Sequence, residues 1–132
     1  MNLSSDLSVL VVEDDPIIAR DISTSLSGAG MLISGVAHDY SDARAILMKN
    51  TTQLAILDIN LEGEKSGIDI AHELKHEHKI PFIFLTSYSD EKTLQAAQEA
   101  GPYGYLVKPF QEATLITTLK IAWGNYLKLQ NN

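Results

Sequence analysis

The chain has 132 residues, 45% of them hydrophobic, which suits one domain with a core covered on both sides. The formal net charge of −7 disfavours direct nucleic-acid binding, because a phosphate backbone repels an acidic surface. The absence of cysteine excludes disulfides and thiolate zinc sites, and it fits a reducing compartment. Neither a signal peptide nor an apolar run of about 18 residues is present, so we expect a cytoplasmic location and no membrane partner.

Apolar runs and amphipathic segments alternate along the chain. The run 8–12 predicts a strand, and Asp15 before Pro16 predicts the start of a helix. Apolar residues then recur every fourth position up to Gly28 and Gly30, which close that helix. The other predicted strands are 31–37, 53–57, 81–85 and 103–107. The other predicted helices are 41–50, 91–100, 112–129 and one that holds Ile68, Ala71 and Leu74. Ser41 or Asp42 would open the helix 41–50, and Ser66 would cap the helix that holds Ile68.

Five alternations of strand and helix with short connections predict right-handed crossovers. The fold class is therefore α/β: a doubly wound, five-stranded parallel sheet with five helices on its two faces. No internal repeat, low-complexity tract or linker divides the chain, so we expect one domain over 1–132 with flexible ends at about 1–7 and 130–132.

Polar side chains follow the carboxyl ends of these strands, which meet at one edge of a parallel sheet. An oxygen-rich, sulfur-free set of ligands suits Mg²⁺, with Mn²⁺ as an alternative. With the cation, a lysine and a hydroxyl to neutralise a transferring phosphoryl group, Asp58 is the candidate nucleophile. The residues at this edge are Glu13, Asp14, Asp15, Asp58, Asn60, Thr86, Ser87 and Lys108.

Together these landmarks resemble the receiver domain of two-component response regulators, over essentially the whole chain. The resemblance implies a flavodoxin-like fold with strand order 2-1-3-4-5. It makes Asp58 the phosphoacceptor and implies that Asp14 ligates Mg²⁺ directly, Glu13 through water, and Asn60 through its backbone carbonyl.

The resemblance also assigns the switch. Thr86 matches the hydroxyl that moves toward the phosphoryl group, Tyr105 the aromatic residue that turns inward with it, and Lys108 the lysine that pairs with the phosphate. The Lys108-Pro109 peptide bond is expected to be cis.

Two features depart from the common family pattern. The loop 61–67 is about one residue longer and lacks the usual proline. Tyr88, beside Ser87, occupies a position that modulates loss of the phosphoryl group, and its ring would shield the site from water.

The implied function is a signalling switch rather than a conventional turnover enzyme. A histidine kinase or phosphotransfer domain would donate the phosphoryl group, and the face formed by the fourth helix, fifth strand and fifth helix would carry the output. The same face is a candidate for homodimer contact. The cognate kinase, the effector and the oligomeric state are not readable from the sequence.

Simpler interpretations accompany each assignment. Asp58 could end its strand as a turn residue, and the acids at 13–15 could cap the first helix, as we expect of Asp15. Thr86 could be a plain strand-end hydroxyl, Lys108 a solvated charge and Tyr105 an ordinary core ring.

Parts of the sequence also fit other functions. A receiver-like binding module that is never phosphorylated is one alternative. A phosphatase of the haloacid-dehalogenase type is another, but the acids after the first strand lack its D-x-D order. The run 72–76 also fits the H-E-x-x-H zinc motif. The helical wheel places His72 and His76 opposite the apolar stripe, so we expect them to face solvent, where nickel or zinc binding is more plausible than peptidase activity.

Overall fold

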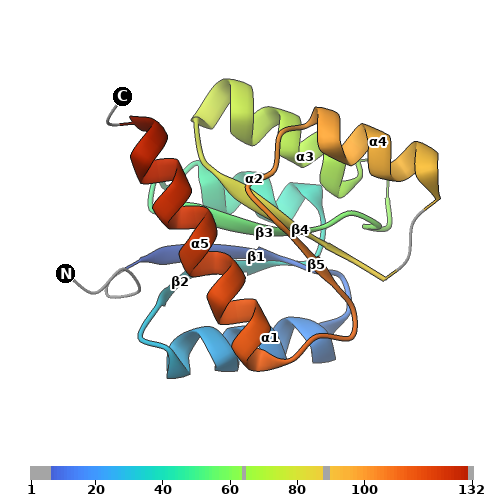
Figure 1. Ribbon diagram of the computed structural model, residues 1–132. Helices are drawn as coiled ribbons and strands as arrows, with labels where there is room; N and C mark the ends of the chain where they lie inside the picture. Colours follow the sequence, from blue (N-terminus) through green and yellow to red (C-terminus); the bar gives the residue numbers. More distant parts are fainter. Residues whose placement is uncertain (1–6, 64, 88–89, 131–132) are drawn as a thin grey trace.

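One parallel sheet with helices on both faces forms the fold (Figure 1). The computed structural model describes residues 7–63, 65–87 and 90–130. The sheet order is β2-β1-β3-β4-β5, which confirms the predicted class and strand order. The strands are β1 Ser8–Val12, β2 Leu32–Ala37, β3 Leu54–Asp58, β4 Phe82–Thr86 and β5 Tyr105–Val107.

The helices divide between the two faces of the sheet. Helices α1 (Pro16–Gly28) and α5 (Glu112–Gln130) cover one face, and α2 (Tyr40–Leu47), α3 (Gly67–Glu73) and α4 (Glu91–Glu99) cover the other (Figure 1). Within the described ranges, no helix combines the length and the apolar character that crossing a bilayer requires.

Alternation along the central strands builds two cores. In β3, Leu54 and Ile56 pack toward α1 and α5, whereas Ala55 and Leu57 pack toward the opposite helices. Because both faces are covered, every residue of β3 and β4 is buried, which explains why these strands read as continuous apolar runs. The same burial brings Asp58, the last residue of β3, to the edge of the sheet.

Two predicted helix caps are confirmed. Oδ1 of Asp15 accepts hydrogen bonds from the backbone N–H groups of Ile17 and Ile18, at 2.9 and 3.3 Å. Ser66 forms a capping box with Asp69, each side chain accepting from the backbone N–H of the other. The capping box fixes where α3 begins, directly behind β3.

The predicted start of the second helix is wrong. Asp39, and not Ser41 or Asp42, is the N-cap of α2, and its Oδ1 accepts the Asp42 N–H at 2.8 Å. The helix also ends at Leu47 rather than Asn50, which has a left-handed φ of 57°. Several adjacent residues here have cap-forming side chains, so only the backbone conformation of Asp39, φ −155°, selects the cap.

This correction gives a test of the cap. Replacing Asp39 by alanine should lower the free energy of unfolding by about 1 kcal/mol, because the Asp42 N–H loses its acceptor. Ser41→Ala is the matched control and should change stability by less than about 0.5 kcal/mol. Urea unfolding of both variants would measure the difference, and equal losses would argue against Asp39 as the cap.

The third helix changes form after Glu73. Residues Leu74–His78 make a π-helical segment, η1, and Lys79 follows in the left-handed conformation with φ 58°. The Ile80 N–H donates to the carbonyl of Leu74 at 3.0 Å, which closes the segment before Pro81. Apolar spacing cannot separate one π turn from α-helix, so this change was not predicted.

The structure describes only part of the two chain ends that the sequence predicted to be flexible. Leu7, expected in a flexible end, is buried, and its carbonyl accepts the Leu32 N–H at 2.8 Å. Gln130 is the last residue of α5. The rest of the predicted flexible ends, 1–6 and 131–132, lies outside the described residues.

Candidate functional site

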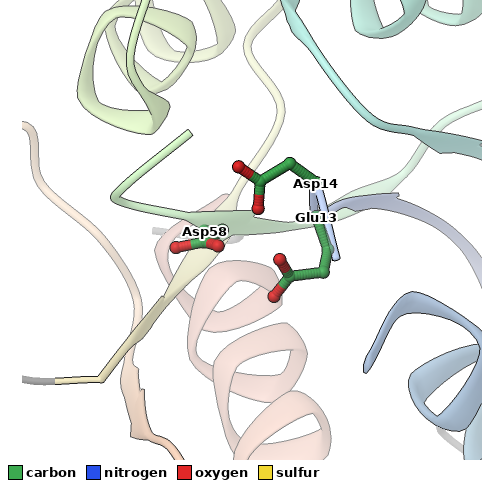
Figure 2. Close-up of side chains that lie close together, drawn as sticks. All are labelled: Glu13, Asp14 and Asp58. Carbon is green, nitrogen blue, oxygen red and sulfur yellow. The ribbon is translucent and has the colours of Figure 1, made fainter. Parts of the chain in front are cut away.

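Three carboxylates converge at the carboxyl edge of the sheet. Glu13 and Asp14 follow β1, and Asp58 ends the adjacent strand β3. Figure 2 shows the three side chains turned toward one another. One carboxylate oxygen from each lies within 4.8 Å of the other two. Among the described residues, this is the one group of three or more acidic, histidine or cysteine side chains that could hold a metal ion.

Asp58 sits at the centre of this group. The residue is nearly buried, with 4% exposure, and Oδ1 accepts the Asn60 N–H at 3.0 Å. Oδ2 lies 3.1 Å from Nζ of Lys108. The carboxylate is thus held on one side by its own loop and on the other by a lysine 50 residues away.

Lys108 joins two of the three carboxylates. Its Nζ lies 2.5 Å from Oε1 of Glu13 as well as 3.1 Å from Asp58. The backbone N–H of Lys108 donates to the Thr86 carbonyl at 2.7 Å, and the Lys108-Pro109 bond is cis. Burial alone would lower the pKa of Lys108, but the two carboxylates outweigh it and raise the pKa, so the ammonium remains charged.

Glu13 is the most enclosed of the acids, with no exposed surface. Burial raises its pKa from 4.5 to about 7, although Lys108 and the Asp15 N–H both favour its charged form. Its Oε2 accepts the Asp15 N–H at 3.0 Å, whereas Oε1 is buried without a hydrogen bond from the described part of the chain and has only the ion pair with Lys108.

Asp14 is held from the loop that follows β3. Its Oδ2 accepts the backbone N–H of Glu62 at 3.2 Å, and the neighbouring Leu61 is buried in the core beneath. The side-chain pattern could not reveal this contact, because Glu62 contributes its backbone.

The donor set fits a hard divalent cation. Three carboxylates face one ammonium, so the fully ionised group has more negative than positive charge, and all its ligand atoms are oxygen. Lys108 pairs with Glu13 and Asp58 but supplies a single positive charge, so the ionised group keeps an excess of negative charge that a divalent cation would offset. A Mg²⁺ or Mn²⁺ ion therefore suits these residues.

The predicted switch residues lie on the adjacent strands. Thr86 ends β4, is 4% exposed, and pairs with Val107 of β5. Tyr105, two residues earlier on β5, is 36% exposed, and its ring centroid lies 6.2 Å from that of Phe84. Partial burial raises the pKa of the Tyr105 hydroxyl.

Of the two residues predicted to modulate loss of the phosphoryl group, Ser87 and Tyr88, the structure describes Ser87. Ser87 is exposed and helps to line a groove of about 560 Å³ beside Lys108. Tyr88 lies outside the described residues, so its shielding of the site stays a prediction.

The H-E-x-x-H sequence does not form a catalytic zinc site in the described part of the chain. His72 and His76 are exposed, as predicted, and Glu73 accepts a hydrogen bond from the Tyr40 hydroxyl at 2.7 Å. A zinc site of this type needs a third protein ligand, but the acids further along the chain, Glu91 and Glu99, do not join the two histidines in a metal-ligand group.

One contributor was missed by sequence reasoning. Nδ1 of His38 lies 3.0 Å from the backbone carbonyl of Glu13, and because a carbonyl only accepts, Nδ1 carries the proton. His38 follows β2, whose register beside β1 places it there. No motif in the sequence signals a side-chain contact to a backbone atom 25 residues away.

Comparison with known proteins gives consistent matches. The response regulator receiver domain family matches residues 9–120. The transcriptional regulatory protein PdtaR of Mycobacterium tuberculosis is 31% identical over 121 residues, 92% of this chain and 58% of PdtaR. The DNA-binding response regulator MtrA of Mycolicibacterium smegmatis is 30% identical, over 85% of this chain and 48% of MtrA. The chain spans about half the length of these curated relatives.

A solved structure is similar over nearly its full length. The signal receiver domain of a modulated diguanylate cyclase from Desulfovibrio desulfuricans has a TM-score of 0.86 and 32% identity, covering 93% of this chain and 97% of that chain.

Proposed function

Since this chain belongs to the response regulator receiver domain family, we propose that residues 1–132 form one phosphorylatable signalling switch with Asp58 as phosphoacceptor. The observation that carries the proposal is the convergence of Glu13, Asp14 and Asp58 within 4.8 Å, with Lys108 bound to Asp58 at 3.1 Å. Receiver domains are signalling modules rather than conventional enzymes. The proposed chemistry is accordingly one phosphoryl transfer followed by hydrolysis.

In the proposed transfer, a carboxylate oxygen of Asp58 attacks the phosphorus of a phosphohistidine on a kinase or phosphotransfer domain. A P–O bond forms to Asp58 as the P–N bond breaks, and the donor histidine recovers a proton on its nitrogen. The ammonium of Lys108 would follow the transferred charge from the carboxylate to the phosphoryl oxygens. The hydroxyl of Thr86, at the end of β4, is the proposed second partner of those oxygens.

Asp14, Asp58, the backbone carbonyl of Asn60 and, through water, Glu13 would hold Mg²⁺ or Mn²⁺. When bound, the cation neutralises charge on the phosphoryl oxygens. The chain's own residues do the orienting: the Asn60 and Glu62 N–H groups hold the carboxylates of Asp58 and Asp14.

The proposed output is a population shift on the face of α4, β5 and α5. Tyr105 is 36% exposed here, so an inward turn that follows Thr86 would change the surface of β5. Leu94 and Val107 expose apolar surface on the same face, which supports contact with an effector or a second copy. No direct nucleic-acid or membrane contact is proposed for this acidic domain, which we place in the cytoplasm.

A groove beside Lys108 is a candidate docking site for the domain that donates the phosphoryl group. The groove of about 560 Å³ beside Lys108 and Ser87 is lined on one side by α1 and on the other by the start of α5. Ile17, at the start of α1, is 72% exposed and lines an adjoining hollow that shares Asp21, Ser25 and Glu112 with this groove. An exposed apolar residue near a groove that is lined by Lys108, the partner of Asp58, suits a docking donor domain.

Phosphorylation by acetyl phosphate tests the proposal. Incubation with Mg²⁺ should add the mass of one phosphoryl group to the wild type, measured by intact-protein mass spectrometry, and Asp58→Asn should add none. Asp15→Asn is the matched control and should be modified like the wild type, because the Asp15 side chain caps α1, a role that asparagine can also fill, and the backbone N–H bonded to Glu13 is unchanged. Equal modification of Asp58→Asn and wild type would contradict the assignment, and no modification of either would favour an unphosphorylated binding module.

A further inference from the structure

Two imidazoles lie side by side on the surface and are not part of the carboxylate group. His72 is in α3 and His76 in η1, four positions apart, and both side chains are exposed. Their rings are parallel, at 1°, with centroids 6.1 Å apart. Neither ring has a hydrogen bond or ion pair to the residues that the structure describes. Glu73, the acid between them in the sequence, accepts a hydrogen bond from the Tyr40 hydroxyl.

We propose that His72 and His76 form a surface chelate for a divalent transition-metal ion of the Ni²⁺, Zn²⁺ and Cu²⁺ group. Residues four apart share one face of a helix, so a single ion can reach both rings. Because each metal–nitrogen bond is about 2 Å and a ring nitrogen lies about 1 Å from the ring centre, one ion can bridge rings whose centroids are up to about 6 Å apart.

The observed pair needs rotation of both side chains to bind. The parallel rings at 6.1 Å lie at the upper limit of that span, which only a linear N–metal–N arrangement reaches. For an angle of about 90–110°, the rings must come about 1 Å closer through χ1, and they must turn about χ2 to aim a nitrogen from each at one ion. This torsion is broad for histidine, and both rings are exposed, so rotation costs little. Water would fill the remaining coordination positions, which makes this an open, exchangeable site.

The chemistry separates this site from the carboxylates. Imidazole nitrogen is a good ligand for Cu²⁺, Ni²⁺ and Zn²⁺ and a poor one for Mg²⁺, which prefers oxygen. The helix that carries the pair begins at Gly67, directly behind Asp58, and His72 and His76 lie five and nine residues further on, roughly 7 and 13 Å along the axis. The two sites should therefore fill independently, each with its own class of cation.

The positive charge of Lys75, next to His76 in the sequence, would repel a bound cation if it lay beside the histidine pair. The ammonium of Lys75 extends over Gly101, where an ideal Cβ would lie 2.7 Å from its Nζ. The overall charge of −7 favours approach of a cation.

Binding would also link two different helical forms. The chelate would span the junction between α3 and η1, and an unfolded chain does not hold the two rings together. Metal that binds the folded state more tightly should raise the melting temperature.

Isothermal titration with NiCl₂ tests the site, using chain without a histidine tag in excess Mg²⁺. The wild type should bind one equivalent, and His72→Asn and His76→Asn should each weaken binding by about tenfold or more, because one imidazole cannot chelate. His78→Asn is the matched control on the same segment and should bind like the wild type. Saturating Ni²⁺ should raise the melting temperature of the wild type and of His78→Asn only.

Two results would overturn the chelate. One is a wild type whose Ni²⁺ affinity is no greater than that of His72→Asn. The other is His76→Asn with wild-type affinity, which would locate binding elsewhere. The three substituted histidines, His72, His76 and His78, are exposed or partly exposed, and circular dichroism of each variant would verify that it is folded.

Discussion

Replacing Gly67 by alanine should lower the free energy of unfolding by about 3 kcal/mol. An ideal Cβ at this position would lie 2.0 Å from the backbone oxygen of Asp58, 2.8 Å from its carbonyl carbon and 3.0 Å from the Cα of Ile59. All three atoms belong to backbone, so no side chain can turn away. Relief requires α3 to move off β3, and that movement would displace the proposed phosphoacceptor.

Urea unfolding and acetyl phosphate labelling would both report this change. We expect Gly67→Ala to lose stability and also to accept less phosphoryl group than the wild type in equal time. Gly124→Ala in α5 is the matched control: nothing lies within 4 Å of its added Cβ, so alanine should raise stability by about 0.5–1 kcal/mol. A Gly67→Ala protein as stable as the wild type would mean that α3 is less closely seated than its glycine contact indicates.

The second large effect is on the pH dependence of stability without metal. The pKa of Glu13 is about 7 in the folded protein and 4.5 as the ordinary value. The folded state thus binds more protons between these values, and stability should fall as the pH rises from about 4.5 to about 7. At about 1.4 kcal/mol per pKa unit, the fall from this one group is about 3 kcal/mol.

Glu13→Gln removes that titration. Between pH 5 and pH 8, the free energy of unfolding of the variant should gain about 2.5 kcal/mol relative to that of the wild type, measured by urea unfolding in EDTA. The exposed Glu99→Gln serves as control and should follow the wild type at both pH values. Parallel stability curves for Glu13→Gln and wild type would show that burial does not hold the proton on Glu13. Added Mg²⁺ should reduce the wild-type decline, because a cation favours the ionised carboxylates.

Much of the site could be anticipated because it lies at strand ends. Asp58 follows four apolar residues, and a parallel sheet brings every carboxyl end to one edge, so the pattern alone placed Asp14, Thr86 and Lys108 near it. The structure brings the acids and Lys108 together in that way. Their roles in phosphoryl transfer stay predictions.

The features that were not anticipated involve backbone atoms or small changes of geometry. Glu62 reaches Asp14 through its N–H, and His38 reaches a carbonyl of Glu13, so neither contact depends on a recognisable side-chain pattern. The cap at Asp39 was wrongly placed because several cap-forming residues are adjacent. The π-helical segment after Glu73 was missed because its apolar spacing resembles an ordinary helix.

By itself, the sequence determined the class of fold and the edge of the sheet where the chemistry gathers, since hydrophobic periodicity and chain order act locally and repeat reliably. Only the tertiary structure decided how that edge is charged. Burial of Glu13 and its ion pair with Lys108 depend on strands 95 positions apart in the chain, and desolvation has no local signature.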